Sequence, residues 1–243
     1  MPNPTAAMLV IGDEILSGRT RDANMHHLAG ELTTHGIDLR EVRFVPDDHD
    51  AIVAALNALR AAHDHVFTSG GIGPTHDDIT ADAVAAAFGV GIDIREDARA
   101  ILAAHYDGTG RELNAARLRM ARIPDGAVLI ENPVSAAPGF SIGNVHVMAG
   151  VPSIFQAMAA MVLPTLTTGV PLFSQTLPVA QGEGDIAETL RAAAARFPGL
   201  SFGSYPHIRD GVVGVRVVVR GTDAAAVDAA VVELARALEQ PAA

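Results

Sequence analysis

The sequence predicts a three-layer α/β domain with a mostly parallel sheet, followed by a small α+β domain. Short apolar segments at 6–11, 37–45 and 64–69 are each followed by a segment of helical periodicity, as in parallel sheets with crossover helices. A turn-rich segment at 163–171 then separates these elements from a second series of strands and helices. The chain of 243 residues is 49% hydrophobic and 19% charged, so it can bury a core.

The helices of the first domain are predicted from apolar spacing and capping residues. A first helix contains Met25, Leu28 and Leu32 at helical intervals and ends before Gly36. Asp50 is expected to cap the next helix. Three residues of that helix share one face: Ile52, Leu56 and Leu59. Further helices are predicted at Ile79–Phe88, Glu96–Tyr106, Glu112–Ala121 and from Pro152 to about Leu163.

The remaining strands of the first domain include a hairpin. Ala127–Ile130 is one strand, and Phe140–Ile142 and Val145–Met148 flank Gly143-Asn144, a two-residue turn signal. An antiparallel edge of this kind is common on parallel sheets. We therefore assign residues 1–165 to the first domain.

A second, smaller domain is predicted at residues 171–243. Its elements are strands at 172–179, 200–205 and 212–220 and helices at 185–196 and 223–238. Two helices on a small sheet make this an α+β unit.

Composition excludes several classes of function. The formal net charge of -11 disfavours nucleic-acid partners, which bind clustered Lys and Arg. The chain has no Cys, which removes disulfides and thiolate chemistry. The N-terminus lacks signal-peptide features and no apolar run is long enough to span a membrane, so we expect a cytoplasmic protein without membrane partners.

A glycine-rich loop, TSGGIGPTHDDIT at 68–80, carries the main functional signal. Gly70, Gly71 and Gly73 allow positive φ angles and a close approach of the backbone to a ligand. The helix that follows offers free N–H groups and the positive end of its dipole, which together attract anions. The spacing matches neither the dinucleotide-binding fingerprint nor a P-loop.

The carboxylates Asp77 and Asp78 in this loop suggest a metal ion. They would repel a bound phosphate unless a divalent cation such as Mg²⁺ lay between them. We therefore predict a site for Mg²⁺, Mn²⁺ or Co²⁺ at Asp77 and Asp78. The alternative is that Asp77, Asp78 or Thr80 caps the following helix.

Two other acidic loops are expected beside the glycine-rich loop. Gly12-Asp13-Glu14 follows the first strand and Pro46-Asp47-Asp48 follows the second. Ligands of open parallel sheets bind beyond the carboxyl ends of the strands, where these loops meet. The convergence favours a ligand site over three unrelated surface turns.

Five separated motifs carry a resemblance to a known family: GDEILSG, VPDD, TSGGIGPTHDDIT, NPVSAAPGF and MAGVP. Together they resemble the molybdopterin-binding domain of molybdenum-cofactor biosynthesis proteins, and more closely the N-terminal part of the CinA (competence/damage-inducible) family. GEGDIAETL and FGSYP extend the likeness through the second domain. Ile72 stands where the cofactor-synthesis branch has Thr, which favours the CinA-like branch. Ser135 departs from the Gly that is frequent in the family.

The resemblance implies roles for particular residues. Asp78, Asp47 and Glu14 would serve catalysis, and Asp78 matches a position that can also bind the metal. The implied ligand-binding residues are Gly12, Asn24, Ser69, Gly70, Gly71, Gly73, Pro74, Thr75, Asn132, Pro138, Gly139, Gly150 and Pro152.

Three functions remain open at this point. The chain could bind molybdopterin, hydrolyse a nucleotide pyrophosphate such as ADP-ribose or FAD, or serve as a non-catalytic interaction or oligomerisation module. The resemblance implies a homo-oligomer, a dimer or trimer, and a small phosphorylated ligand. The amidase domain of longer CinA proteins is not expected here, so neither is nicotinamide-mononucleotide deamidation.

His63 and His65 alternate on or beside a predicted strand and share one face. A metal site would need further ligands, which the sequence does not place beside them. We therefore interpret both histidines as structural.

Overall fold

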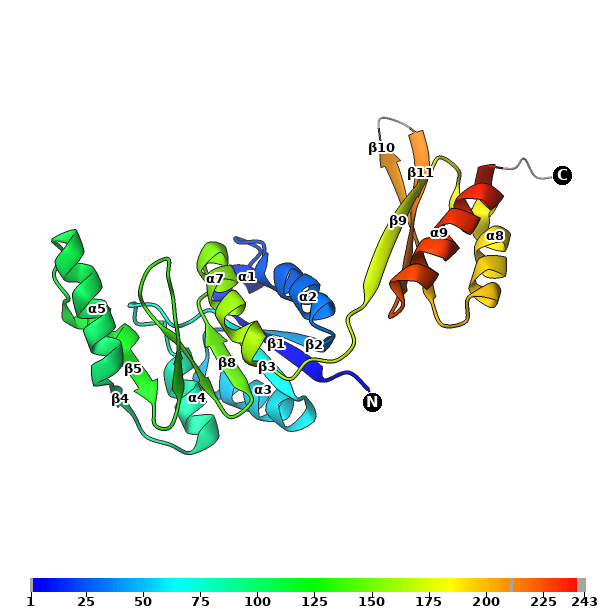
Figure 1. Ribbon diagram of the computed structural model, residues 1–243. Helices are drawn as coiled ribbons and strands as arrows, with labels where there is room; N and C mark the ends of the chain where they lie inside the picture. The colour runs from blue at the N-terminus through cyan, green and yellow to red at the C-terminus, as the bar shows by residue number, and fades with distance from the viewer. Residues whose placement is uncertain (1, 210–211, 240–243) are drawn as a thin grey trace. The chain divides into compact units, whose positions relative to one another are not determined.

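The computed structural model describes residues 2–209 and 212–239 (Figure 1). The chain forms two compact units, Met1–Gly169 and Val170–Ala243. None of the described helices is long and apolar enough to span a membrane.

A six-stranded, mostly parallel sheet forms the centre of the first unit. β1 (Thr5–Ile11), β2 (Asp38–Val45), β3 (His65–Ser69) and β8 (Val145–Met148) run parallel to one another. β7 (Gly139–Ile142) is antiparallel to both β8 and β6 (Val128–Ile130). The order is β2-β1-β3-β8-β7-β6, which confirms the predicted fold class and its hairpin edge.

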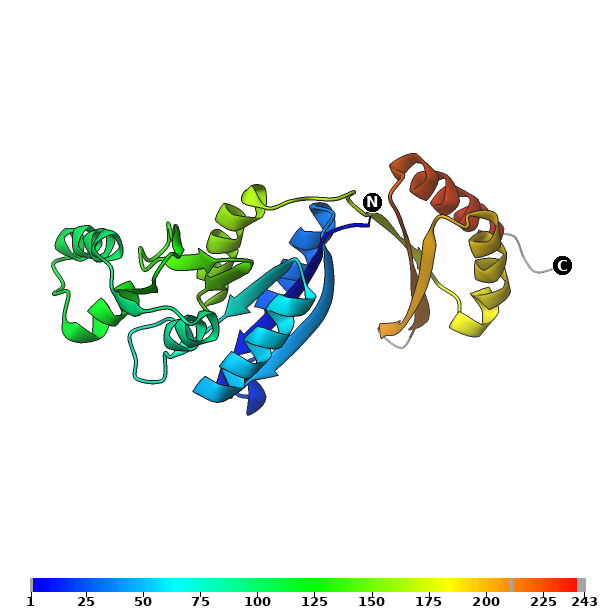
Figure 2. The ribbon, with the colours of Figure 1, turned by 90° about the horizontal axis from the view of Figure 1, so that it is seen from below.

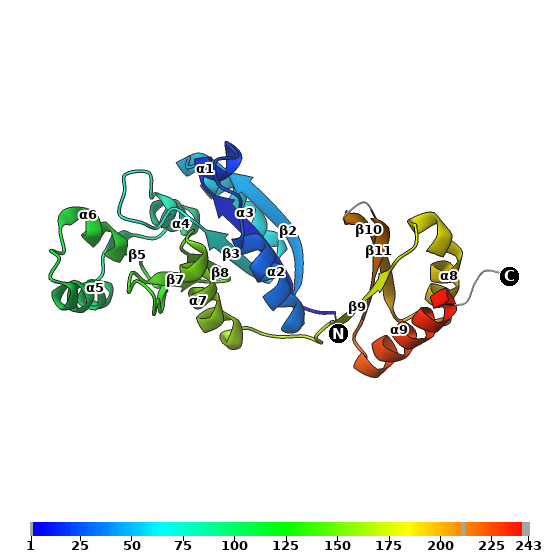
Figure 3. The ribbon, with the colours of Figure 1, turned by 90° about the horizontal axis from the view of Figure 1, so that it is seen from above.

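Helices cover both faces of this sheet, as predicted. α2 (Asn24–Thr34) and α7 (Pro152–Val162) pack on one face, and Figure 3 shows them nearest the viewer. α3 (His49–Ala62) and α4 (Thr80–Phe88) pack on the other, which faces the viewer in Figure 2. The buried side chains of β1 alternate between the two resulting cores.

Short elements around this frame were missed or misplaced by sequence reasoning. The helix predicted at Glu112–Ala121 is wrong in extent: α6 spans only Ala115–Leu118, capped by Asn114, and a 3-10 turn η1 follows at Arg119–Ala121. The elements without a sequence prediction are α1 (Asp13–Leu16), β4 (Ile92–Ile94), β5 (Arg122–Pro124) and a 3-10 turn η2 (Leu163–Thr165). The predicted helix at Glu96 is present as α5 (Glu96–Thr109).

The expected cap of α3 is also corrected. Asp48, not Asp50, is the N-cap residue, and its Oδ1 accepts a hydrogen bond of 2.8 Å from the backbone N–H of Ala51. Asp50 lies in the first turn instead, where its negative charge interacts favourably with the positive end of the helix dipole. The sequence offered two neighbouring aspartates, and only backbone geometry distinguishes them.

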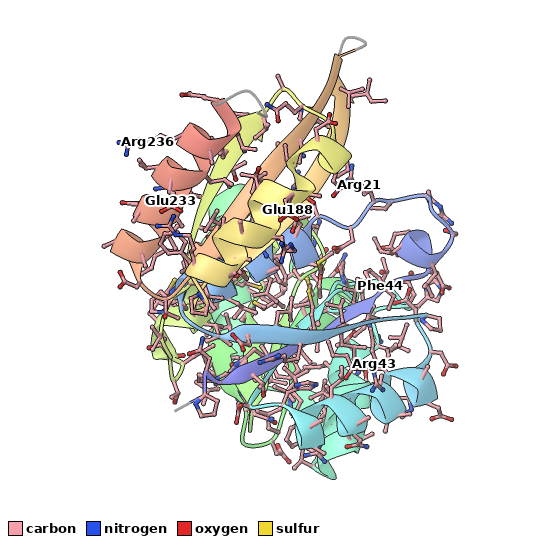
Figure 4. All side chains as sticks on the ribbon, turned by 90° about the vertical axis from the view of Figure 1, so that its right-hand side faces the viewer. Arg21, Arg43, Phe44, Glu188, Glu233 and Arg236 are labelled. Carbon is pink, nitrogen blue, oxygen red and sulfur yellow. The ribbon has the colours of Figure 1, made fainter. Side chains whose placement is uncertain are left out.

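The second unit has two helices on a three-stranded antiparallel sheet of order β10-β11-β9. Its elements are β9 (Phe173–Val179), α8 (Glu183–Arg196), β10 (Ser201–Arg209), β11 (Val212–Gly221) and α9 (Ala224–Glu239). Alternate valines of β11 pack against both helices. Glu188 on α8 and Glu233 on α9 lie on the outside of these helices (Figure 4), where they pair with Arg191 and Arg196.

Candidate functional site

The glycine-rich loop leaves the carboxyl end of β3 with a backbone that only glycine tolerates. Gly70 has φ of 106° and Gly71 has φ of 67°. A Cβ atom on Gly70 would lie 2.2 Å from the carbonyl oxygen of Ile11, and one on Gly71 would lie 2.1 Å from Oγ1 of Thr80. Both glycines are therefore required by conformation and by space.

Thr80, the first residue of α4, fastens this loop to the helix. Its hydroxyl donates a 3.0 Å hydrogen bond to the carbonyl oxygen of Gly70, and its N–H donates a 3.0 Å bond to that of Gly71. Thr80 is fully buried. The N-cap residue of α4 is Ile79, which makes no side-chain cap bond, so the capping alternative for Thr80 is wrong.

Asp78 stabilises the loop from within. Its Oδ2 accepts hydrogen bonds from the N–H of Thr75 at 2.8 Å and from the Thr75 hydroxyl at 2.5 Å. A Cβ on Gly73 would lie 2.6 Å from the same oxygen. Asp78 thus closes a tight turn and does not cap α4. Asp77 is exposed, and its Oδ1 lies 3.8 Å from Nδ1 of His76.

A cleft of about 560 Å³ opens beside this loop at the carboxyl end of the sheet. It is lined by twelve of the residues that the sequence singled out: Gly12, Glu14, Asp47, Gly70, Gly71, Gly73, Pro74, Asp77, Asp78, Asn132, Gly150 and Pro152. All three acidic loops contribute to its walls. Apolar side chains, including Ile72, Met120 and Ile154, complete the lining.

Other predicted residues support the cleft from behind. Asn24 is 3% exposed, and its Nδ2 donates to Oγ of Ser69 at 2.8 Å and to the carbonyl oxygen of Gly150 at 2.7 Å. A Cβ on Gly139 would lie 2.3 Å from the carbonyl oxygen of Val147, so Gly139 permits close packing of two strands. Thr75 and Pro138 were also predicted as ligand-binding residues, and they too do not line the cleft.

Acidic groups dominate the electrostatics of the cleft. Oδ2 of Asp47 accepts a 3.0 Å hydrogen bond from the N–H of Asp13. Partial burial raises the pKa of Asp47, and the nearby carboxylates of Asp13, Glu14 and Asp77 raise it further, against the lowering effect of that hydrogen bond. A positive partner for these charges is therefore favoured at the cleft.

We expect Asp47→Asn to stabilise the first unit slightly at pH 7. Because the folded pKa of Asp47 is raised, its ionised form carries a cost that is complete above that pKa and absent below the ordinary value of 3.8. Asn keeps the acceptor for Asp13, and solvent screening keeps the gain to a fraction of a kcal/mol. Urea unfolding at pH 7 and pH 3 checks this; a gain that persists at pH 3 would contradict it.

Two arginines near the cleft were missed by sequence reasoning. Nη2 of Arg119 donates a 3.4 Å hydrogen bond to the carbonyl oxygen of Asp78, and its Nε is buried without a partner. Arg19 lines a neighbouring hollow of about 510 Å³ together with Glu14 and Asp47. These cations partly offset the acidic field. Arg119 lies 41 positions from Asp78 in sequence, so no local pattern could connect them.

Comparison with known families identifies the two units. Residues 7–168 match a family model described as a probable molybdopterin binding domain. The chain belongs to this molybdopterin-binding-domain family. Residues 171–243 of this family member match a second model, described as the middle domain of FAD synthase.

Individual relatives place the protein among CinA-like members of the molybdopterin-binding-domain family. A CinA-like protein of Citrifermentans bemidjiense is 40% identical over 166 residues, 66% of this chain and 40% of the relative. The chain thus spans less than half of that relative. A protein of Aeropyrum pernix is 32% identical over 98% of this chain and 92% of its own length. The crystal structure of CinA from Thermoplasma acidophilum, of unknown function, is 36% identical with a TM-score of 0.62, covering 68% of this chain and all of that one.

Proposed function

We propose that the first unit binds a phosphate-bearing pterin or nucleotide in the cleft, together with a divalent cation. The observation that carries this proposal is the left-handed backbone at Gly70 and Gly71, which lines the cleft directly beyond the end of β3. Such a backbone next to a helix start lets phosphate oxygens approach N–H groups closely. The match to the molybdopterin-binding model supports a ligand of this class.

The acidic lining supports a cation in this proposal. Glu14, Asp47, Asp77 and Asp78 all face the cleft, so a phosphate ligand alone would meet net repulsion. In the described parts of the chain, no three His, Cys, Asp or Glu side chains are grouped to hold a metal ion. The cation would therefore take its other ligands from phosphate oxygens and water, as Mg²⁺ commonly does.

Hydrolysis of a nucleotide pyrophosphate is the second candidate function. The match of residues 171–243 to a domain of FAD synthase favours a nucleotide ligand. Asp47 lies in the cleft with a raised pKa, which suits a group that orients or deprotonates a water molecule. Glu14 is the alternative for this role. A bound cation would supply charge stabilisation for the pyrophosphate.

Calorimetry with ADP-ribose tests the binding proposal. We expect binding in the presence of Mg²⁺ and a loss of at least ten-fold in affinity with EDTA or in Asp78→Asn. Asp50→Asn is the matched control, because the side chain of Asp50 is 98% exposed and outside the cleft. Affinity that is indifferent to both EDTA and Asp78→Asn would contradict the proposal.

Product analysis separates the two candidate functions. If the protein is a pyrophosphatase, incubation of ADP-ribose with Mg²⁺, Mn²⁺ or Co²⁺ releases AMP, and Asp47→Asn or Glu14→Gln reduces kcat at least a hundred-fold. Retention of molybdopterin through purification without AMP release favours the binding module. If neither AMP release nor molybdopterin retention is observed, the non-catalytic interaction module is the better account.

A further inference from the structure

Ser135 lies on the wall of the cleft, in the loop 131–138 between β6 and β7. Glycine is frequent at this position in the family, so the serine adds a hydroxyl where many relatives have no side chain. Ser135 is half-buried, and Asn132, which also lines the cleft, is 7% exposed. The bonds that this hydroxyl already makes decide what it can offer to a ligand.

The amide of Asn132 holds the loop through four hydrogen bonds. Its Oδ1 accepts from the backbone N–H groups of Val134 and Ser135, each at 3.1 Å. Its Nδ2 donates to the carbonyl oxygen of Ala137 at 2.8 Å and to Oγ of Ser135 at 2.7 Å. Because a backbone N–H can only donate and a carbonyl oxygen can only accept, these partners fix which end of the amide carries the protons.

The same network fixes the role of the Ser135 hydroxyl. An amide nitrogen does not accept hydrogen bonds, so Oγ of Ser135 is the acceptor in its contact with Asn132. A serine hydroxyl also carries one proton that it can donate. Within residues 2–209 and 212–239, this O–H has no acceptor. Ser135 therefore keeps a free hydrogen-bond donor on the wall of the cleft.

The loop is held in this form against its conformational preference. Ala136 has φ of 63° and is the one described residue other than glycine with a positive φ. Its N–H donates a 3.0 Å hydrogen bond to the carbonyl oxygen of Asn132. Residues in this conformation persist only where their surroundings over-determine it, and they are frequent at ligand sites. Since Ser135 is bound to Asn132 through both its N–H and its Oγ, its position is set before a ligand arrives.

We propose that Ser135 determines ligand specificity in the cleft by donating a hydrogen bond from its hydroxyl to an acceptor atom of the ligand, with Asn132 as the positioning residue. The inference rests on the function proposed above. Pterins and nucleotides offer phosphate oxygens, carbonyl oxygens and ring nitrogens as acceptors. The ionised carboxylates that line the cleft can only accept hydrogen bonds. Ser135 thus supplies a donor that these carboxylates cannot supply.

Calorimetry with ADP-ribose and Mg²⁺ tests this role in the full chain. We expect Ser135→Ala to lose about five-fold in affinity or more, which is the effect of one lost hydrogen bond. Ser135→Thr keeps the hydroxyl and should bind nearly as tightly as the wild type. Ser174→Ala is the matched control, because Ser174 is an exposed serine on β9 of the second unit. The proposal is overturned if Ser135→Ala binds like the wild type, or if Ser135→Thr loses as much affinity as Ser135→Ala.

Inorganic pyrophosphate with Mg²⁺ is the second probe and shows which acceptor of the ligand is used. A loss of affinity for both probes in Ser135→Ala assigns the contact to a phosphate oxygen. A loss for ADP-ribose alone assigns it to the organic part of the ligand. Either result supports the donor role of Ser135.

Thermal unfolding with and without ligand separates a ligand contact from a purely structural role. Ser135→Ala leaves three of the four hydrogen bonds of the Asn132 amide in place, so the ligand-free variant should melt close to the wild type. The difference in Tm should widen when ADP-ribose and Mg²⁺ are added. A difference that the ligand does not change would overturn the contact. If the wild-type chain binds neither probe, the cleft proposal itself fails; if it binds them and Ser135→Ala binds equally well, only the role of Ser135 fails.

Discussion

Replacing Gly70 by Ala is expected to destabilise the first unit by about 3 kcal/mol or more. A non-glycine residue in a left-handed conformation costs about 1–2 kcal/mol, and the overlap of the new Cβ with the Ile11 carbonyl oxygen at 2.2 Å adds a packing cost of about 1–3 kcal/mol. Because Ile11 ends β1, the strain falls on two strands at once. Ligand affinity in the cleft should fall with it.

Gly89→Ala provides the control for backbone conformation alone. Gly89 ends α4 with φ of 66°, and a Cβ there would meet nothing within 4 Å. It should therefore cost only about 1 kcal/mol. Calorimetric unfolding measures the difference, and hydrogen exchange of β1 and β3 localises it. Equal losses in the two variants would show that the contact with Ile11 is unimportant.

The second large effect is expected at Asn24. Asn24→Ala removes the donor for both the buried hydroxyl of Ser69 and the partly buried carbonyl oxygen of Gly150. Leaving buried polar groups unsatisfied costs about 1–3 kcal/mol each, so we expect a total of about 2–4 kcal/mol. The variant would lose the hydrogen bonds that link α2 to the end of β3 and to the segment at Gly150.

A double-mutant cycle with Ser69→Ala checks that assignment. Ser69→Ala alone should cost only about 1 kcal/mol, because Asn24 keeps its bond to Gly150. The double variant should be less destabilised than the sum of the single variants, since both remove the same bond. Additive losses, measured by urea unfolding, would refute a direct link between the two side chains.

Local patterns predicted most of this architecture. The buried strands and amphipathic helices have strong periodicity, and the conformational needs of Gly70 and Gly71 were evident from the loop itself. Strands β4 and β5 have only three residues each, too few for an alternating pattern to appear.

Contacts between distant positions could not be predicted in the same way. Asn24 and Gly150 are separated by 126 positions, and Arg119 reaches Asp78 across 41. His65 meets His146 only because β8 pairs with β3. Each of these pairings depends on strand order and helix packing, which a single sequence leaves open.

The alternation of β1 between two apolar cores has a consequence for how the strand finds its place. Sliding by one position would exchange Ala6, Met8 and Val10 with Ala7, Leu9 and Ile11, and would expose no charge. The apolar pattern of β1 alone therefore does not define its register against the neighbouring strands. Polar contacts at its ends do so: Thr5 donates from its N–H and hydroxyl to Asp64 at 2.7 and 2.8 Å, and the N–H of Gly12 donates to Val45. These contacts at the two ends of β1 fix its register, and thereby align the glycine-rich loop with the acidic loops at the carboxyl end of the sheet.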